Sequence, residues 1–371
     1  MNSSTPDPPG NFLSHLPPWT IAAPVVAAVI FLGAGFGFGG YYVVLIALGV
    51  AGSVFGAVHH AEVVAQRIGE PYGTLVLALA VTLIEVALIV SLMVAGGAEA
   101  SALARDTVFA AVMIILNGIV GLCLLVGGLK HREQVFSLDG VSAALVALAA
   151  IAIMTLVFPN FTVTTPGPYY SPSQLILIAI VSVVLYGTFI FTQTIGHRQY
   201  FLEGLSEDDA ETDRGSGTPS NAVAAASGFL LLLCLIAVVL LAKKLAPDLE
   251  SAVARMGAPD ALVGVVIAGI VLLPEGLAAV RAARQNRLQT SLNLALGSAL
   301  ASIGLTIPAV SVLSLWMGSK LLLGIDAKSM ILLMLSLLVT MLVLRTGRTI
   351  ILHGVVLLVI FAVYLFTTVV P

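Results

Sequence analysis

Long apolar segments make up most of this chain of 371 residues, and they restrict what it can fold into. Hydrophobic residues account for 59% of the sequence and charged residues for 9%, whereas soluble domains carry about 25% charged residues. A transmembrane helix needs about 20 predominantly apolar residues. Eleven segments meet this requirement, at 19–37, 40–65, 74–97, 107–128, 139–158, 173–195, 223–243, 259–280, 290–316, 321–344 and 349–370. We therefore expect an all-α polytopic membrane protein with about eleven transmembrane helices.

Two glutamates interrupt these apolar segments near their centres. Glu85 lies in AVTLIEVALIVSL and Glu275 in AGIVLLPEGLAAV, and Glu62 is near the end of another segment. An ionisable side chain at the middle of a bilayer costs at least roughly 2.5–3.5 kcal/mol, so it is usually kept there for ion or proton handling. The pair Glu85 and Glu275 is therefore the first candidate for a functional site.

Loop charges and one polar stretch predict the topology. With eleven spans, the loops on the side of the N-terminus hold ten Lys and Arg residues, against six on the opposite side. Because cytoplasmic loops carry the excess of basic residues, we expect a cytoplasmic N-terminus. The polar stretch 199–222 divides six spans from five and is interpreted as a tether, although its acidic residues could also concentrate cations. Glu85 and Glu275 lie in the third and eighth spans, so their helices run in opposite directions, as in inverted repeats.

Polar residues on the helices that follow each glutamate complete a set of oxygen ligands. Asn117 follows Glu85, and Ser298 and Ser302 follow Glu275, four residues apart and therefore on one helix face. Hard cations such as Ca²⁺ bind six to eight such oxygens. Two carboxylates neutralise one divalent ion and, once it has left, favour protonation in a medium of low dielectric. A site of this kind would exchange cations for protons.

Pro274 and the cluster of two histidines with Glu62 each allow two interpretations. Pro274 removes a backbone hydrogen bond and frees a carbonyl about one turn earlier, which indicates either an ion ligand or a packing kink. His59, His60 and Glu62 form a candidate proton relay or secondary cation site, or an interfacial cluster in contact with water. Their HHxE pattern does not match the zinc signature H-E-x-x-H, so an intramembrane metalloenzyme is disfavoured.

The second half of the chain resembles a known family. The run LLPEGLAAVRAARQNRLQTSLNLALGSALAS is similar to the α-repeat of the cation/calcium exchanger superfamily, in which a glutamate element is followed by a helix containing a GS step. Glu275 corresponds to the repeat glutamate and Ser298 to the GS step, and Glu85 and Asn117 correspond to a more divergent first copy. The stretch around Glu85 is similar to bacterial calcium/proton antiporters of the ChaA type. The sequence departs from the family pattern at Val81–Thr82 and at Lys243–Lys244, whose roles the resemblance does not explain.

The resemblance implies a fold and an activity. The expected organisation is a tail at 1–18, an extra helix at 19–37, a first five-helix repeat at 40–195, an acidic linker at 196–222 and a second, inverted repeat at 223–371. The implied function is secondary active antiport of cytoplasmic Ca²⁺, and also of Na⁺ or K⁺, against external H⁺. No cofactor and no nucleic acid are implied; the partners are inorganic cations, protons and the lipid bilayer. The alternatives are a Na⁺(K⁺)/H⁺ antiporter without Ca²⁺ preference and a passive cation channel.

Overall fold

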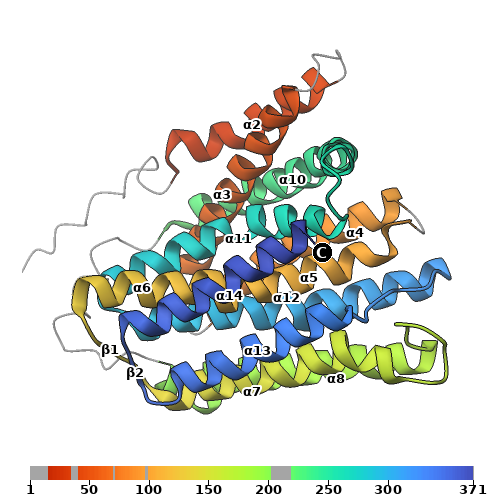
Figure 1. The fold of residues 1–371 in the computed structure, drawn as a ribbon. Coiled ribbons are helices and arrows are strands. Elements are labelled where there is room, and N and C mark those ends of the chain that lie inside the picture. The colour runs from red at the N-terminus through yellow and green to blue at the C-terminus, as the bar shows by residue number, and fades with distance from the viewer. Residues whose placement is uncertain (1–15, 35–40, 70–71, 97–98, 202–218, 371) are drawn as a thin grey trace, which may run out of the picture.

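The computed structural model describes residues 16–34, 41–69, 72–96, 99–201 and 219–370. Within these ranges the fold is helical apart from a two-stranded ribbon (Figure 1). Nine helices in this part of the chain are long and apolar enough to cross a membrane, and two shorter apolar helices lie at Pro18–Gly33 and Leu79–Val94. The prediction of an all-α membrane protein with about eleven helices is confirmed.

The helices follow the predicted segments closely. In chain order they are α2 (Pro18–Gly33), α3 (Tyr42–Ile68), α4 (Tyr72–Gly96), α5 (Leu103–Met113), α6 (Val120–His131), α7 (Leu138–Ala152), α8 (Pro172–Phe191), α10 (Asn221–Arg255), α11 (Ala261–Arg284), α12 (Leu288–Met317), α13 (Ala327–Leu344) and α14 (Ile351–Val369). Three of the spans contain a π-helical stretch: η3 (Ile114–Ile119) joins α5 to α6, η4 (Ile153–Val157) extends α7, and η6 (Thr192–Gly196) extends α8. Short 3₁₀ turns occur at η2 (Glu99–Ala102), η5 (Phe158–Phe161) and η7 (Arg198–Tyr200).

The end of α10 differs most from the prediction. Helix α10 does not end at Lys243 but continues through Pro247 to Arg255. Its last turns are amphipathic: Leu245 and Val253 are buried while Lys243 and Lys244 are exposed. The predicted end was wrong because a helix continues wherever one face remains covered, even after the apolar run has ended. Helix α11 runs without interruption through Pro274, and α12 likewise contains Pro308 in its interior.

Helix α12 occupies the centre of the fold. It packs against α4, α7, α8 and α11, and its residues Leu292, Leu296 and Leu300 are fully buried. Helices α2, α3 and α10 pack together at one edge of the molecule, whereas α7, α8 and α13 lie at the opposite edge (Figure 1). The four helices α4, α5, α11 and α12 lie between these layers, so the side chains on their inward faces are shielded from lipid by the rest of the fold.

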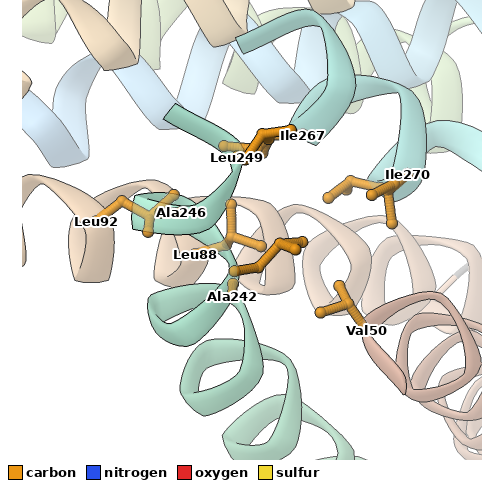
Figure 2. Close-up of a pocket in the computed structure, with 10 residues that line it drawn as sticks. Val50, Leu88, Leu92, Ala242, Ala246, Leu249, Ile267 and Ile270 are labelled. Atoms are coloured by element: carbon orange, nitrogen blue, oxygen red, sulfur yellow. The ribbon is translucent and has the colours of Figure 1, made fainter. Parts of the chain in front are cut away.

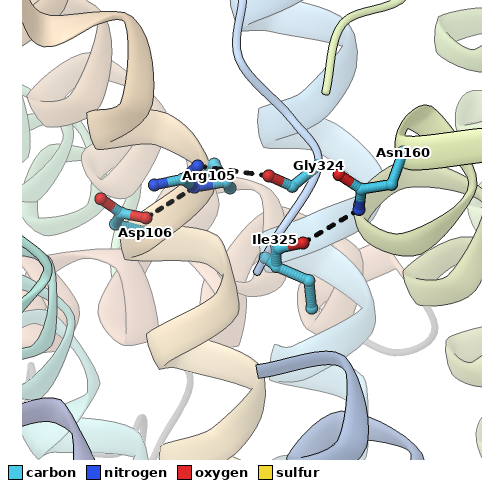
Figure 3. A network of polar contacts seen from close by, with 5 residues as sticks. All are labelled: Arg105, Asp106, Asn160, Gly324 and Ile325. Atoms are coloured by element: carbon cyan, nitrogen blue, oxygen red, sulfur yellow. Dashed lines mark hydrogen bonds and ion pairs between the residues drawn. The ribbon is translucent and has the colours of Figure 1, made fainter. Parts of the chain in front are cut away.

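Hydrogen bonds tie distant segments together at both ends of the bundle. At one end, strand β1 (Gln134–Val135) pairs antiparallel with β2 (Arg348–Thr349), which joins the α6–α7 connection to the α13–α14 connection. At the other end, the segment before α13 is held by two side chains (Figure 3). Arg105, which is bonded to Asp106 at 2.7 Å, donates to the carbonyl of Gly324 at 3.2 Å, and Asn160 donates to the carbonyl of Ile325 at 2.9 Å.

The contact between α14 and α6 depends on Gly354. A Cβ atom at this position would lie 2.7 Å from the carbonyl oxygen of Gly121 and close to the backbone of Leu125. We expect Gly354→Ala to lower the free energy of unfolding by about 1–3 kcal/mol, because the backbone of α6 must move. Thermal unfolding in detergent measures this change.

The matched control is Gly228→Ala in α10, where an added Cβ meets nothing within 4 Å. This substitution should leave stability unchanged or raise it slightly, since alanine is the better helix former. Equal stability of the Gly354→Ala and Gly228→Ala proteins would contradict the packing argument.

Candidate functional site

The glutamates at the centres of α4 and α11 are both bonded to α12. Ser302 donates a hydrogen bond from its hydroxyl to Glu85, and Ser298 donates to Oε1 of Glu275 at 3.2 Å. The two serines are one helical turn apart, a rise of about 6 Å along the axis. The carboxyl groups therefore face one strip of α12, near enough to interact electrostatically. The structure brings together four of the five predicted ligand residues.

Burial of these carboxyl groups makes their charged forms unfavourable. Glu85 is 6% exposed, and Oε2 of Glu275 is buried without a hydrogen-bond partner among the described residues. A buried carboxylate without compensation costs several kcal/mol, so it takes up a proton or binds a cation. The pair can hold either species, and the Ser298 and Ser302 hydroxyls supply further oxygen atoms.

Asn117, the fifth predicted ligand, lies in the π-helical stretch η3. Its amide nitrogen donates to Ser336 of α13 at 2.8 Å and to the carbonyl of Met113 at 3.3 Å. Its Oδ1 is buried and has no partner within the described ranges. Neighbouring Ile119 packs against α11, since a Cβ on Gly276 would lie 3.2 Å from its Cδ1. Asn117 thus has a free side-chain oxygen, although its amide nitrogen is held by α13.

Thr306 is a residue that the sequence analysis missed. It follows Ser302 by one turn on α12, is fully buried, and its hydroxyl has no hydrogen-bond partner in the described part of the chain. The signal was present in the sequence, since Ser298, Ser302 and Thr306 repeat at intervals of four and so share one helix face. The polar strip of α12 is therefore longer than predicted.

His60 of the predicted histidine cluster is bonded to a neighbouring helix. Its Nε2 donates to the carbonyl oxygen of Thr20 in α2 at 3.3 Å. In a regular helix that carbonyl would accept from the amide four residues on, but this residue is Pro24, which has no N–H. His60 therefore replaces a hydrogen bond that a proline removed, and so holds α2 against α3.

The other two members of the cluster lie closer to the surface. The ring of His59 lies 5.7 Å from those of both Trp19 and His60. Glu62 is exposed, and its carboxyl group interacts electrostatically with His59 and Arg281. No described hydrogen bond or ion pair joins the three residues to Glu85 or Glu275, so a role as a secondary proton site stays a prediction.

An apolar cavity lies between α3, α4, α10 and α11 (Figure 2). Leu88 follows Glu85 by about one turn on α4, and Val271 precedes Glu275 by about one turn on α11. The lining residues, all of them apolar, are Val50, Leu88, Leu92, Ala242, Leu245, Ala246, Leu249, Ile267, Ile270 and Val271. They offer no oxygen or nitrogen ligand to an ion, so the surface next to the site toward the α4–α5 and α10–α11 connections is apolar.

These features define a polytopic membrane protein with a buried two-carboxylate site, and sequence comparison gives the family. The model of the sodium/calcium exchanger protein family matches residues 38–195 and 226–370. The chain belongs to this family. The resemblance to the cation/calcium exchangers predicted from the α-repeat is thereby confirmed.

Individual relatives cover most of the chain. It is 52% identical over 322 residues to the putative ionic transporter y4hA of Sinorhizobium fredii, with 87% of each chain covered. It is 39% identical over 320 residues to the sodium-potassium/proton antiporter ChaA of Escherichia coli, with 86% of each covered.

Solved structures share the fold. The structure of native YfkE superimposes with a TM-score of 0.73 at 18% identity, covering 95% of this chain and all of that chain. The crystal structure of the H⁺/Ca²⁺ exchanger CAX gives a TM-score of 0.70 at 15% identity, covering 96% of this chain and 89% of the other.

The bond between His60 and Thr20 can be tested by a double substitution. We expect His60→Leu to lower the free energy of unfolding by about 1–3 kcal/mol, because the Thr20 carbonyl loses its donor. Adding Pro24→Ala should recover part of this loss, since residue 24 then supplies the missing amide. Thermal unfolding of the two single variants and the double variant measures the coupling. Additive effects would show that the two residues do not compensate for one another.

Proposed function

We propose that this protein is a secondary active antiporter that exchanges Ca²⁺ for H⁺ and also accepts Na⁺ or K⁺. The observation that carries the proposal is the pairing of Glu85 and Glu275 on one face of α12, with an unsatisfied oxygen on Glu275. Cation binding and protonation are alternative ways to satisfy the same buried oxygens, so they exclude one another. Exchange follows from this competition.

The relatives support the reaction type and leave the preferred cation open. One is named a sodium-potassium/proton antiporter, and a more distant one, 27% identical over 223 residues, a Ca(2+)/H(+) antiporter of Aphanothece halophytica. A Na⁺(K⁺)/H⁺ antiporter without Ca²⁺ preference is therefore the second candidate. The ligand set proposed here is Glu85, Glu275, Ser298 and Ser302, with Asn117 contributing its free oxygen.

Transport further requires that the site opens to each side in turn. We propose a cytoplasmic N-terminus in the bacterial inner membrane, which places the apolar cavity between the site and the exterior. Two inverted five-helix halves, 40–195 and 223–371, would supply the two arrangements, each open to one side.

Removing either buried carboxylate tests the assignment. We expect Glu85→Gln and Glu275→Gln to abolish cation-driven proton flux, because a neutral amide can neither balance a cation nor take up the exchanged proton. The measurement is dequenching of a pH-sensitive dye in everted vesicles after addition of CaCl₂, NaCl or KCl. Glu250→Gln, an exposed change on α10, should leave the flux unchanged.

The same assay separates an antiporter from a channel. In an antiporter, an imposed pH gradient must drive ⁴⁵Ca²⁺ or ²²Na⁺ movement against its own gradient. Cation movement that ignores the pH gradient would establish a passive channel, and normal exchange by Glu275→Gln would refute the two-carboxylate site.

The hydrogen bond from Ser302 to Glu85 predicts a partial loss of cation affinity when it is removed. Ser302→Ala removes the described donor to this carboxylate, so the apparent cation affinity should fall by about 10-fold or more, as for other hydrogen bonds to charged groups. Ser311→Ala, on the same helix, removes a hydroxyl bonded only to the backbone of Ile307 and serves as the control. The concentration that gives half-maximal flux reports both effects. Equal affinities would exclude a role for Ser302 in the site.

A further inference from the structure

A second cavity lies between α6 and α11, on the side of the membrane opposite to the apolar cavity. Its volume is about 430 Å³, and its lining residues are Val126, Leu129, Lys130, Val280 and Arg284. The cavity is open toward the surroundings of the bundle rather than enclosed. The cavity is separate from the paired glutamates and uses none of the proposed cation ligands.

The walls of this cavity continue into two apolar stripes. On α6, Leu122 and Leu129 are 40% and 65% exposed and lie on one face with Val126. On α11, Leu273 and Leu277 are 44% and 43% exposed. Residues at these spacings line up along a helix, so the two exposed stripes lead to the cavity, and together they are called the groove. In a membrane-spanning bundle such a groove faces hydrocarbon chains.

Two basic side chains, Lys130 and Arg284, lie at the end of the groove, where α6 and α11 terminate. Lys130 donates one hydrogen bond to the carbonyl of Arg284 at 2.9 Å, and His131 also lies 3.0 Å from this oxygen. The ammonium group is thereby fixed at the mouth of the cavity with further N–H groups available. Within the described ranges, the guanidinium of Arg284 forms no ion pair, and the nearby Glu133 is paired with Arg348.

We infer that this cavity binds an anionic phospholipid, with its phosphate on Lys130 and Arg284 and an acyl chain along the groove. Basic pockets between transmembrane helices are suited to anionic headgroups, and the positive charge here has no described carboxylate to balance it. The apolar lining of Val126, Leu129 and Val280 favours a lipid over free phosphate, which would gain nothing from those side chains.

The position of this site connects it to the paired glutamates. Arg284 is nine residues after Glu275 on the same helix, about 14 Å along its axis. Helix α6 continues from η3, which holds Asn117 and packs on α11 through Ile119 and Gly276. A lipid that bridges α6 and α11 therefore contacts the helix that carries Glu275 and the helix that continues from the turn with Asn117. Lipid binding stabilises the packing of α6 against α11 that forms the cavity.

Lipid binding is measured by native mass spectrometry of the full-length protein titrated with phosphatidylglycerol, with phosphatidylcholine as the comparison. We expect phosphatidylglycerol to bind more tightly, and Lys130→Gln/Arg284→Gln to weaken its binding about 10- to 30-fold. The control Arg67→Gln/Arg345→Gln removes two exposed charges on the same side of the membrane, outside the cavity, and should bind within about twofold of wild type. If the double variant does not fold, Arg284→Gln alone provides the test, since its side chain makes no described bond.

A third variant separates a lipid from a free anion. Leu129→Trp fills the groove but keeps the basic side chains of Lys130 and Arg284, so it should also weaken phosphatidylglycerol binding. Unchanged binding to this variant, or displacement of the lipid by an equal concentration of inorganic phosphate, would show that the cavity takes a small anion and would overturn the proposal. Equal binding of phosphatidylcholine, or equal loss in the control variant, would show unspecific lipid contact and would overturn it as well.

Discussion

The buried carboxyl groups of Glu85 and Glu275 are the constraint on which the rest of the structure depends. A bilayer centre tolerates ionisable groups only where protein surrounds them and supplies hydrogen bonds. Helix α12 meets both needs, since it is packed against α4 and α11 and places Ser302 and Ser298 at the two carboxyl groups. The layers outside this core keep the pair away from lipid, so many of the helices serve to make a charged site possible.

Proline residues have different consequences in this fold depending on what replaces the missing amide. In α2, the carbonyl freed by Pro24 is taken by His60, and a docking contact results. In α11, Pro274 directly precedes a glutamate and the helix stays continuous. The carbonyl it frees lies on the same helix as the carboxyl group, where a backbone oxygen can serve as an ion ligand.

Much of the fold and part of the site could be predicted from the sequence. The spans were predictable because membrane thickness sets their length, and the residues Glu85, Glu275, Ser298 and Ser302 were predictable because their polarity is costly in apolar segments. The end of α10 was not, because it depends on packing beyond the apolar run. The π-helical turn at Asn117 and its bond to Ser336, 219 residues away, were not predictable either, because they arise from tertiary contacts. The same holds for His60, whose partner Thr20 lies on another helix.

The hydrogen-bonded ties at the two ends of the bundle are distributed unevenly. The β1–β2 ribbon at one end, and the Arg105 and Asn160 bonds at the other, all join elements among α5, α6, α7, α13 and α14. The layer of α3 and α10 instead meets α4 and α11 across the apolar residues of Figure 2. Apolar surfaces can slide without breaking directional bonds, so a compliant seam of the molecule passes close to its two acids.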